Sequence, residues 1–390
     1  MMKVKTDSKK IEEILSSGVE EVIDKVHLKK RLLSGKVLRI KHGIDPTGPK
    51  IHIGRATQFW KLKNFQDLGH QVVLIIGDFT AQIGDASDKQ SMRQPLSKRE
   101  IKENMKDYTK QIGKILDMKK VELHYNSEWL GKFNARDLLN LAMKFTAQQM
   151  IQRRNFKERW NKGAPIGLHE LNYPLLQGFD SVAVKADVEL GGFDQLFNLK
   201  TGREIQKIFN QPPQDIIVLK MLFGPDGRKM STSWGNVINI IDKPEEQFGK
   251  IMSMKDELIP DYFELCTKIP PKEIKYLPPR EAKARLAREI VAIYHNKKAA
   301  LKAEKEFNRV FKEKKLPSKI PIVPIKAKEL NILDLLTKTK LALSRSEAKR
   351  LVEQRGVKIA GKLQQDWQKT IKIKKGEVIQ VGKRKFLKIA

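Results

Sequence analysis

Residues 42–59, HGIDPTGPKIHIGRATQF, hold a group of side chains suited to phosphate chemistry. Within this segment His52, Gly54 and Arg55 stand close together. A glycine lets a flat base or a phosphate approach the backbone, while a histidine ring and a guanidinium both donate hydrogen bonds to phosphate oxygens. The segment therefore indicates a nucleotide or phosphate site, although a plain helix cap would explain His52 and Gly54 equally well.

A second segment, GPDGRKMSTSW at residues 224–234, combines glycines and hydroxyl groups with Arg228 and Lys229. Such a loop suits a transient grip on a polyphosphate. It is not a P-loop, because the glycine spacing that precedes a Lys-Ser/Thr pair is absent. Taken alone, the segment is more typical of a solvated basic turn.

The elements that would position the first segment form an α/β pattern. VLRIKHGI at 37–44 predicts a strand, and a helix should run from about 54 to 68 with Gly69 at its C-cap. The apolar run at 72–78 is typical of a strand buried in a parallel sheet. Strand, helix and strand form a βαβ unit, which predicts a Rossmann-like, doubly wound parallel sheet. The start of its helix would favour phosphate.

The rest of the chain adds mostly helical pattern. Residues 8–34 have the spacing of one amphipathic helix, and 97–210 are largely helical with a strand-like insert at 121–125. A second βα passage covers 182–190. The pattern is helical again from about 243 to 312.

The C-terminal region predicts a separate small α+β unit. Three prolines in residues 316–325 indicate a semi-rigid linker. Residues 331–390 follow with a net charge of +11. Within them Ser344 should cap a helix that ends at Gly356, and three strands should follow.

The amino-acid composition indicates what kind of partner the chain binds and in which compartment it works. The chain of 390 residues has 77 Lys and Arg against 46 Asp and Glu, a net charge of +31, so we expect a polyanionic partner. The single cysteine, Cys266, excludes an intrachain disulfide and a cysteine-based zinc site, and suggests a small buried apolar group. No apolar run reaches the length of a membrane span, so we expect a soluble protein in the reducing cytoplasm with no membrane partner.

Several conspicuous side chains have no motif around them. We expect packing in the core or at an interface for four of these, namely Trp60, Trp129, Trp160 and Met143. No spacing suggestive of a metal site surrounds the histidines His27, His124 and His295.

The two segments form an ordered pair, HIGR at 52–55 and KMSTS at 229–233, that resembles the HIGH and KMSKS signatures of class I aminoacyl-tRNA synthetases. Further motifs in the expected order are similar to bacterial tyrosyl-tRNA synthetases: FQDLGH (65–70), IGDFTAQIGD (76–85), YNSEWL (125–130), HELNYPLLQGFDSVAVKADVELGGFDQLFN (169–198) and GREIQ (202–206). Residues 341–362, LALSRSEAKRLVEQRGVKIAGK, resemble the RNA-binding module of the ribosomal-protein S-four type that ends the longer bacterial branch of this family.

The resemblance implies four parts. These are a Rossmann-like catalytic domain with a helical insertion (1–222), the signature loop with a helical anticodon-side domain (223–315), the proline-rich linker (316–328), and the basic RNA-binding module (329–390).

It also implies an activity, ligands and site residues. The activity would be tyrosine–tRNA ligation, with ATP and Mg²⁺ as co-substrate, tRNA(Tyr) as partner, no tightly bound cofactor, no protein-bound metal, and a homodimeric assembly. The implied catalytic residues are His52, Gly54, Arg55, Lys229, Ser231 and Thr232. The implied ATP-binding residues are Asp45, Thr47, His52, Gly54, Gly192, Asp194, Lys229 and Thr232. The implied tyrosine-binding residues are Lys41, Asp85, Tyr173, Gln177, Asp180 and Gln195, with Asp180 accepting a hydrogen bond from the phenol. The implied RNA-binding residues are Ser344, Arg345, Lys349, Arg350, Arg355, Lys358, Lys362, Lys383 and Arg384.

The sequence departs from the family pattern at five positions. Arg55 replaces the second signature histidine, and Thr232 replaces the second signature lysine, which removes one cation from the pyrophosphate grip. Phe193 stands where a small hydroxyl residue is usual, and Ala360 where a turn asparagine is usual. Lys41 stands where the shorter branch has a phenol-binding tyrosine.

Two alternatives stay open at this point. A tryptophan-specific sister enzyme shares the fold and the signatures, but it normally lacks the basic module and would not need Asp180. A non-catalytic RNA-binding paralogue would keep the fold without the activation step, and the substitutions at Arg55 and Thr232 keep this alternative open.

Overall fold

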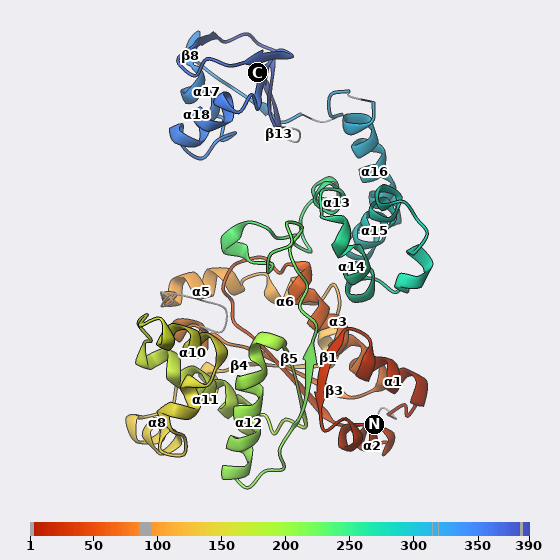
Figure 1. Cartoon of the computed structure of the whole chain (residues 1–390), viewed down its shortest axis with the longest axis vertical. Helices are drawn as coiled ribbons and strands as arrows, with labels where there is room; N and C mark the ends of the chain where they lie inside the picture. Colours follow the sequence, from red (N-terminus) through yellow and green to blue (C-terminus); the bar gives the residue numbers. More distant parts are fainter. Residues whose placement is uncertain (1–3, 86–94, 314, 319, 383–384) are drawn as a thin grey trace. The chain divides into compact units, whose positions relative to one another are not determined.

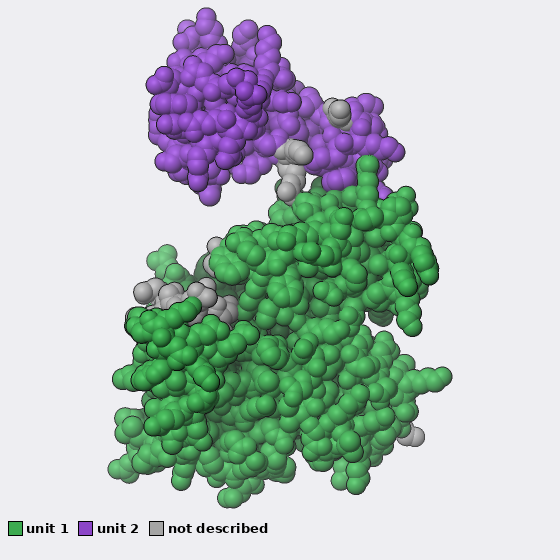
Figure 2. Space-filling model, in the orientation of Figure 1, with its two compact units in different colours: residues 1–301 green, residues 302–390 purple. Residues whose placement is uncertain are grey.

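The computed structural model describes residues 4–85, 95–313, 315–318, 320–382 and 385–390. The chain divides into two compact units, residues 1–301 and 302–390, which Figure 2 shows in different colours. Unit 1 contains an α/β sheet with its covering helices, and unit 2 contains a small strand-rich module (Figure 1).

The sheet of unit 1 has six strands in the order β1-β6-β5-β2-β3-β4 (Figure 1). Its strands are β1 (Val19–Ile23), β2 (Arg39–Ile44), β3 (Gln71–Ile76), β4 (Val121–Tyr125), β5 (Val188–Gly192) and β6 (Asp215–Leu219). All neighbours are parallel except β1, which pairs antiparallel with β6. From the central strand β2 the chain fills the sheet in one direction through β3 and β4, and in the other through β5 and β6. This doubly wound order confirms the predicted fold class, and it places a topological switch point between β2 and β5.

The predicted βαβ unit is confirmed within a few residues. Strand β2 is followed by α3 (Ile53–Leu68) and then by β3, whose residues Gln71–Ile76 pair with Arg39–Ile44. Gly69 ends α3 with a φ of +93°, a conformation that glycine adopts without strain.

The prediction of one helix over residues 8–34 was wrong. The chain forms α1 (Ser8–Ser16), strand β1 and then α2 (Lys25–Leu33). Gly18 and Asp24 have φ values of +64° and +59°, and a right-handed helix cannot continue through such residues. The apolar residues of β1, which fitted a helical stripe, pair with β6 instead.

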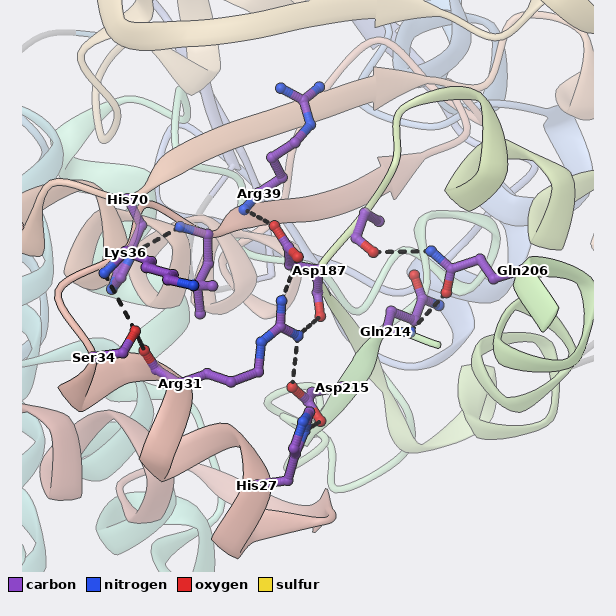
Figure 3. A network of polar contacts seen from close by, with 12 residues as sticks. His27, Arg31, Ser34, Lys36, Arg39, His70, Asp187, Gln206, Gln214 and Asp215 are labelled. Atoms are coloured by element: carbon purple, nitrogen blue, oxygen red, sulfur yellow. Dashed lines mark hydrogen bonds and ion pairs between the residues drawn. The ribbon is translucent and has the colours of Figure 1, made fainter. Parts of the chain in front are cut away.

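A polar network joins α2 to the amino ends of the parallel strands (Figure 3). Arg31 Nη1 donates to Asp215 Oδ2 at 3.1 Å and to the Asp187 carbonyl oxygen at 3.1 Å. His27 Nδ1 lies 2.9 Å from Asp215 Oδ1, and the backbone N–H of Arg39 donates to Asp187 Oδ2 at 2.8 Å. The network therefore ties the starts of β2, β5 and β6 to one helix.

The segment between β3 and β6 is mainly helical, as predicted, apart from strands β4 and β5. Its helices are α4 (Thr80–Ile83), α5 (Lys98–Met105), α6 (Tyr108–Ile112), α7 (Ser127–Leu130), α8 (Ala135–Ala142), α9 (Ala147–Ile151), α10 (Arg154–Asn161), α11 (Leu168–Ala183) and α12 (Leu196–Ile208), with short 3₁₀ turns η1 (Met118–Lys120) and η2 (Phe193–Gln195). The strand predicted from residue 182 begins only at Val188, because α11 runs to Ala183 and Lys185 has a φ of +49°.

Residues after β6 form the signature segment and a helical bundle. These elements are η3 (Thr232–Trp234), α13 (Pro244–Met252), η4 (Asp256–Leu258), α14 (Ile259–Cys266), η5 (Pro271–Ile274), α15 (Pro279–Tyr294) and α16 (Lys297–Phe311). Helix α15 packs on both α13 and α14. Cys266 is buried there, as predicted.

Unit 2 folds around its own apolar core. Its elements are β7 (Ile322–Val323), β8 (Glu329–Asn331), α17 (Ile332–Lys338), α18 (Arg345–Glu353), β9 (Val357–Ile359), β10 (Lys362–Gln364), β11 (Thr370–Lys372), β12 (Val378–Val381) and β13 (Lys385–Ile389). One sheet has the order β10-β9-β12-β13-β7, and β11 pairs with β8. Strand β7 lies within the proline-rich segment and pairs in parallel with β13, so part of that segment belongs to the module's sheet.

Helix α18 begins as predicted, but its C-cap is Gln354, two residues before the predicted Gly356. Ser344 Oγ accepts from the Glu347 N–H at 3.1 Å, while Glu347 Oε2 accepts from the Leu343 N–H at 2.6 Å. Arg355, rather than Gly356, has the positive φ of +56°.

Candidate functional site

A cavity of about 310 Å³ opens at the carboxyl ends of β2 and β5, at the switch point of the sheet. It is lined by ten residues predicted for catalysis or ATP, namely Asp45, Thr47, His52, Gly54, Arg55, Gly192, Asp194, Lys229, Ser231 and Thr232. It is also lined by five residues predicted for tyrosine, namely Asp85, Tyr173, Gln177, Asp180 and Gln195. Segments up to 187 residues apart in the sequence therefore meet in one cavity.

His52 caps the helix that carries the first segment. Its Nδ1 accepts from the Arg55 N–H at 3.3 Å, at the start of α3. A Cβ placed on Gly54 would lie 3.1 Å from His52 Nδ1 and 3.3 Å from Met230 Sδ, so only glycine fits here without displacing a neighbour. Burial, and then the charges of Arg55 and Lys229, lower the pKa of His52 to about 3. The imidazole is therefore neutral at pH 7.

Arg55 reaches back from α3 to the turn after β2. Its Nη2 donates to Thr47 Oγ1 at 2.8 Å, and its Nη1 donates to the Asp45 carbonyl oxygen at 3.2 Å. The carboxylate of Asp45 accepts from Thr80 Oγ1 at 2.7 Å and from the Tyr173 hydroxyl at 3.0 Å. These bonds fix the turn that contributes Asp45 and Thr47 to the lining of the cavity.

The second segment is held against the cavity by Asn236. The side chain of Asn236 accepts from the Ser231 N–H at 2.9 Å and donates to the Lys229 carbonyl oxygen at 3.0 Å. Lys229 Nζ lies 2.9 Å from Asp194 Oδ2. Arg228 points elsewhere, because it is bonded to Asp226 and lies over the Trp234 ring.

Asp180 lies at the closed end of the cavity, with only 3% of its surface exposed. Trp129 Nε1 donates to Asp180 Oδ1 at 2.8 Å, and Asn126 Nδ2 lies 3.4 Å from Oδ2. Burial raises the pKa of Asp180 to about 7, against the opposing effects of the Lys41 charge and these two hydrogen bonds. A carboxyl group so placed can bind a ligand hydroxyl that enters the cavity.

Lys41 lies behind the cavity wall rather than in its lining. Its side chain is fully buried, and Nζ lies 2.8 Å from Glu189 Oε1 and 2.8 Å from Ser181 Oγ. It also donates to the Gln177 carbonyl oxygen at 3.1 Å.

The remaining predicted residues share a side-chain network. Gln195 Nε2 donates to Asp85 Oδ2 at 2.6 Å, and Asp85 also forms an ion pair with Arg153. Asn198 Nδ2 donates to Gln177 Oε1 at 2.7 Å and to Gln195 Oε1 at 3.0 Å. The network holds these amide and carboxylate groups in place along one wall.

Sequence reasoning missed several side chains of this site. Trp129 was predicted to have a packing role, but its indole N–H holds Asp180; Asn126, Thr80 and Arg153 were not singled out. The available signal for Trp129 was chemical, since a buried indole N–H requires an acceptor. Trp160 and Met143 are 63% and 73% exposed, so neither is a core residue.

Seven of the predicted RNA-binding residues lie on the described surface of unit 2. Ser344, Arg345, Lys349 and Arg350 belong to α18 or its cap, Arg355 follows it, and Lys358 and Lys362 lie on β9 and β10. All are exposed except Lys349, which is partly buried with Nζ 4.3 Å from the Trp367 ring centroid. Lys383 and Arg384 lie outside the described residues.

Two general features of the described residues bear on function. No group of three or more His, Cys, Asp or Glu side chains among them could hold a metal ion. Across the same parts of the chain, no helix has the length and apolarity to cross a membrane.

Comparison with known families identifies the class of protein. Residues 33–312 match the family described as "tRNA synthetases class I (W and Y)", and residues 312–389 match "Tyrosine--tRNA ligase SYY-like C-terminal domain". The chain is thus a class I aminoacyl-tRNA synthetase.

Curated relatives narrow this class further. The chain is 46% identical over 387 residues to the tyrosine–tRNA ligase of Thermotoga maritima, covering 97% of this chain and 96% of the relative. It is 44% identical over 390 residues to that of Moorella thermoacetica, covering 96% and 94%. The chain belongs to the tyrosine–tRNA ligases, and neither alternative left open by the sequence is favoured.

Solved structures share the fold. A C-terminally truncated mitochondrial tyrosyl-tRNA synthetase of Aspergillus nidulans has a TM-score of 0.63 at 22% identity, covering 79% of this chain and 94% of the other. The tyrosyl-tRNA synthetase of Archaeoglobus fulgidus, solved with L-tyrosine, has a TM-score of 0.62 at 22% identity, covering 76% and 100%.

Proposed function

We propose that the cavity binds ATP and tyrosine side by side and joins them to form tyrosyl-adenylate. The observation that supports this most strongly is that one cavity at the switch point of the sheet is lined by all the residues predicted for catalysis or ATP and by all those predicted for tyrosine except Lys41. Asp180 would accept the phenol hydroxyl at the closed end, while Lys229 and the start of α3 would hold the phosphates at the open end.

The reaction would proceed in two steps. First, a tyrosine carboxylate oxygen attacks the α-phosphorus of ATP in line, a P–O bond forms, and pyrophosphate leaves with the electron pair of the broken bond. Then the 3′-terminal ribose hydroxyl of tRNA(Tyr) attacks the mixed anhydride and releases AMP. Neither step needs a protein nucleophile, so the chain would act by positioning and by cationic stabilisation of phosphate charge.

Selection of tyrosine would rest on Asp180. Phenylalanine has no hydroxyl group, so it would leave the buried Asp180 carboxyl group without a hydrogen-bond partner. This loss makes the binding of phenylalanine unfavourable relative to tyrosine, so the pocket would reject phenylalanine strongly. Lys41 would act from behind the wall, since its ammonium is already paired with Glu189.

Mg²⁺ would enter with ATP rather than reside in the protein. The nearby carboxylates are engaged with groups of the chain, Asp45 with Thr80 and Tyr173, and Asp194 with Lys229. Such a donor set does not fit a resident metal. The ion would neutralise phosphate charge as part of the substrate.

Unit 2 would contact tRNA phosphates through its basic side chains. Its exposed cations, including Arg350, Arg355, Lys358 and Lys362, suit a polyanion. The division into catalytic (1–222), anticodon-side (223–315), linker (316–328) and RNA-binding (329–390) parts is proposed on the same grounds.

We further propose a cytoplasmic homodimer. Support comes from family membership and from the single buried cysteine, which suits a reducing compartment. Light scattering on the purified full chain tests the assembly, since a monomeric mass would contradict it.

Tyrosine-dependent exchange of pyrophosphate into ATP tests the proposed activation step. We expect exchange with tyrosine, and little with phenylalanine or tryptophan at equal concentration. Exchange that does not require tyrosine, or none at all, would contradict the proposal. Charging of tRNA(Tyr) transcript then tests the second step.

A further inference from the structure

We propose that Arg55 supplies the cation that position 232 lacks, so that helix α3 carries the second positive charge on the leaving pyrophosphate, beside Lys229 of the signature loop. This inference rests on the proposed activation of tyrosine by ATP. It explains two departures from the family pattern as one exchange of charge between two elements.

Thr232 and Arg55 both contact the turn that follows β2. A Cβ placed on Gly48 would lie 3.6 Å from Thr232 Cγ2, which puts the neutral side chain of Thr232 against that turn. One residue away, Thr47 Oγ1 accepts from Arg55 Nη2 at 2.8 Å. Both side chains line the cavity. A guanidinium on α3 therefore reaches the place that the loop residue faces.

The guanidinium keeps its charge available to a ligand. It donates to the hydroxyl of Thr47 and the carbonyl of Asp45, and it is also hydrogen-bonded to the Tyr108 hydroxyl, so these acceptors are all uncharged oxygens. A guanidinium has five N–H donors in a fixed fork, so further donors remain for phosphate oxygens. Arg55 is thus both oriented by the turn and able to bind an anion.

Among the residues that the structure describes, no other basic group near the cavity can replace it. Arg228 is committed to Asp226 and the Trp234 ring, and Lys229 is one cation for a group that leaves with several negative charges. His52 is neutral at pH 7, since burial and the neighbouring cations depress its pKa to about 3. Lys220 is paired with Glu264 at 2.9 Å.

A cation on α3 is also held in position before the ligand binds. The helix and the turn are joined by hydrogen bonds before any ligand arrives, so the charge is in position when ATP binds. The chemical step itself is unchanged. The bond between the α-phosphorus and the bridging oxygen breaks, and Arg55 stabilises the departing negative charge without transferring a proton.

A double-mutant cycle tests the exchange of charge. The four proteins are the full-length parent, Arg55→Gln, Thr232→Lys and the double variant. Gln keeps an uncharged amide donor at this position but removes the charge. Single-turnover formation of tyrosyl-adenylate, the apparent affinity for inorganic pyrophosphate in the reverse reaction, and the dissociation constant of tyrosine are measured for each.

The two substitutions should compensate. Arg55→Gln should slow adenylate formation about ten- to a hundredfold and weaken pyrophosphate, since a charge-assisted contact is lost. Thr232→Lys should restore most of that loss in the double variant, yet change the parent less than about threefold. Tyrosine affinity should stay within about twofold throughout.

A matched control separates this role from general damage. Arg203 also donates to a carbonyl oxygen, that of Gln214 at 2.6 Å, but does not line the cavity. Arg203→Gln should leave adenylate formation unchanged. If Arg55→Gln does not fold, Arg55→Lys, which keeps the charge, replaces it, and it should retain most of the parent rate.

Three results would overturn the inference. The first is a parent-like rate of adenylate formation in Arg55→Gln. The second is an equal effect of Thr232→Lys on that rate in the parent and in Arg55→Gln. The third, where Arg55→Lys is used, is a loss of rate as large as that expected from removing the charge. A parent without tyrosine-dependent exchange would instead contradict the proposed function. The two failures are therefore distinguishable.

Discussion

At Asp180, burial and hydrogen bonding oppose each other at a single carboxyl group. Burial raises its pKa from 3.8 to about 7, while Lys41, Trp129 and Asn126 favour the charged form. An acid with a raised native pKa binds its proton more tightly in the folded state. Its contribution to stability is fully present below about pH 4 and is lost as pH rises through about 7.

Asp180→Asn should remove this pH dependence. The amide cannot ionise, so it has no such loss of stability on raising the pH. The free energy of unfolding of the variant minus that of the parent should therefore increase from pH 5 to pH 8, by an amount on the order of 3 kcal/mol. Urea unfolding of both proteins at the two pH values, without ligands, measures the difference. An equal stability gap at both pH values would mean that Asp180 does not titrate in this range.

Asp180→Ala tests the selection of the phenol. The variant should lose about 1.5–3 kcal/mol of its preference for tyrosine over phenylalanine, because a hydrogen bond to a charged acceptor is removed. Exchange kinetics with both amino acids measure the preference, and the KM for ATP serves as the control. A preserved preference would assign the selection to another group.

At the scale of elements, the signature loop offers a matched pair of cations. Lys229→Ala should slow adenylate formation at least tenfold, since the charge acts mainly on the transition state, while tyrosine affinity stays nearly constant. Single-turnover kinetics measure the rate. Arg228→Ala removes a neighbouring cation that is bonded to Asp226, and it should have little effect. Equal losses in both variants would mean that the loop acts only through its overall charge.

Helices and strands were predictable from the sequence where the local hydrophobic pattern favours the same structure as the pairing with distant strands. The βαβ unit met this condition, because buried apolar runs and the glycine at position 69 mark its boundaries. The segment 8–34 did not, since its apolar spacing suits a helix while β6 recruits residues 19–23 as a strand. Pairing between residues about 200 positions apart leaves no local signal.

The same limit applies within the site. Motifs located His52, Asp180 and Lys229, because residue type and order along the chain are visible in a sequence. The partners of those residues depend on three-dimensional approach. Trp129 lies on a different element from Asp180, so its role became apparent only through their 2.8 Å contact.

At the scale of the whole molecule, the two units allow activation and RNA binding to be separated. Removing residues 317–390 should leave tyrosyl-adenylate synthesis intact while weakening tRNA affinity. It should also flatten the salt dependence of binding, because each lost phosphate contact reduces the slope by about one. Filter binding across a salt series, beside the exchange assay, measures both effects. An unchanged affinity and slope would show that the module is not a tRNA contact.

The truncation is placed before residue 317 so that strand β7 is removed together with the rest of its sheet. Ile322–Val323 pair with β13 although they lie in a proline-rich segment. A chain ended a few residues later, at Ile325, would keep β7 and lose its partner. Its backbone would then offer unsatisfied amides and carbonyls to the same strand of another molecule, and Ile322 is already 63% exposed. Such a truncation would self-associate as protein concentration rises, and turbidity could be mistaken for a loss of RNA binding.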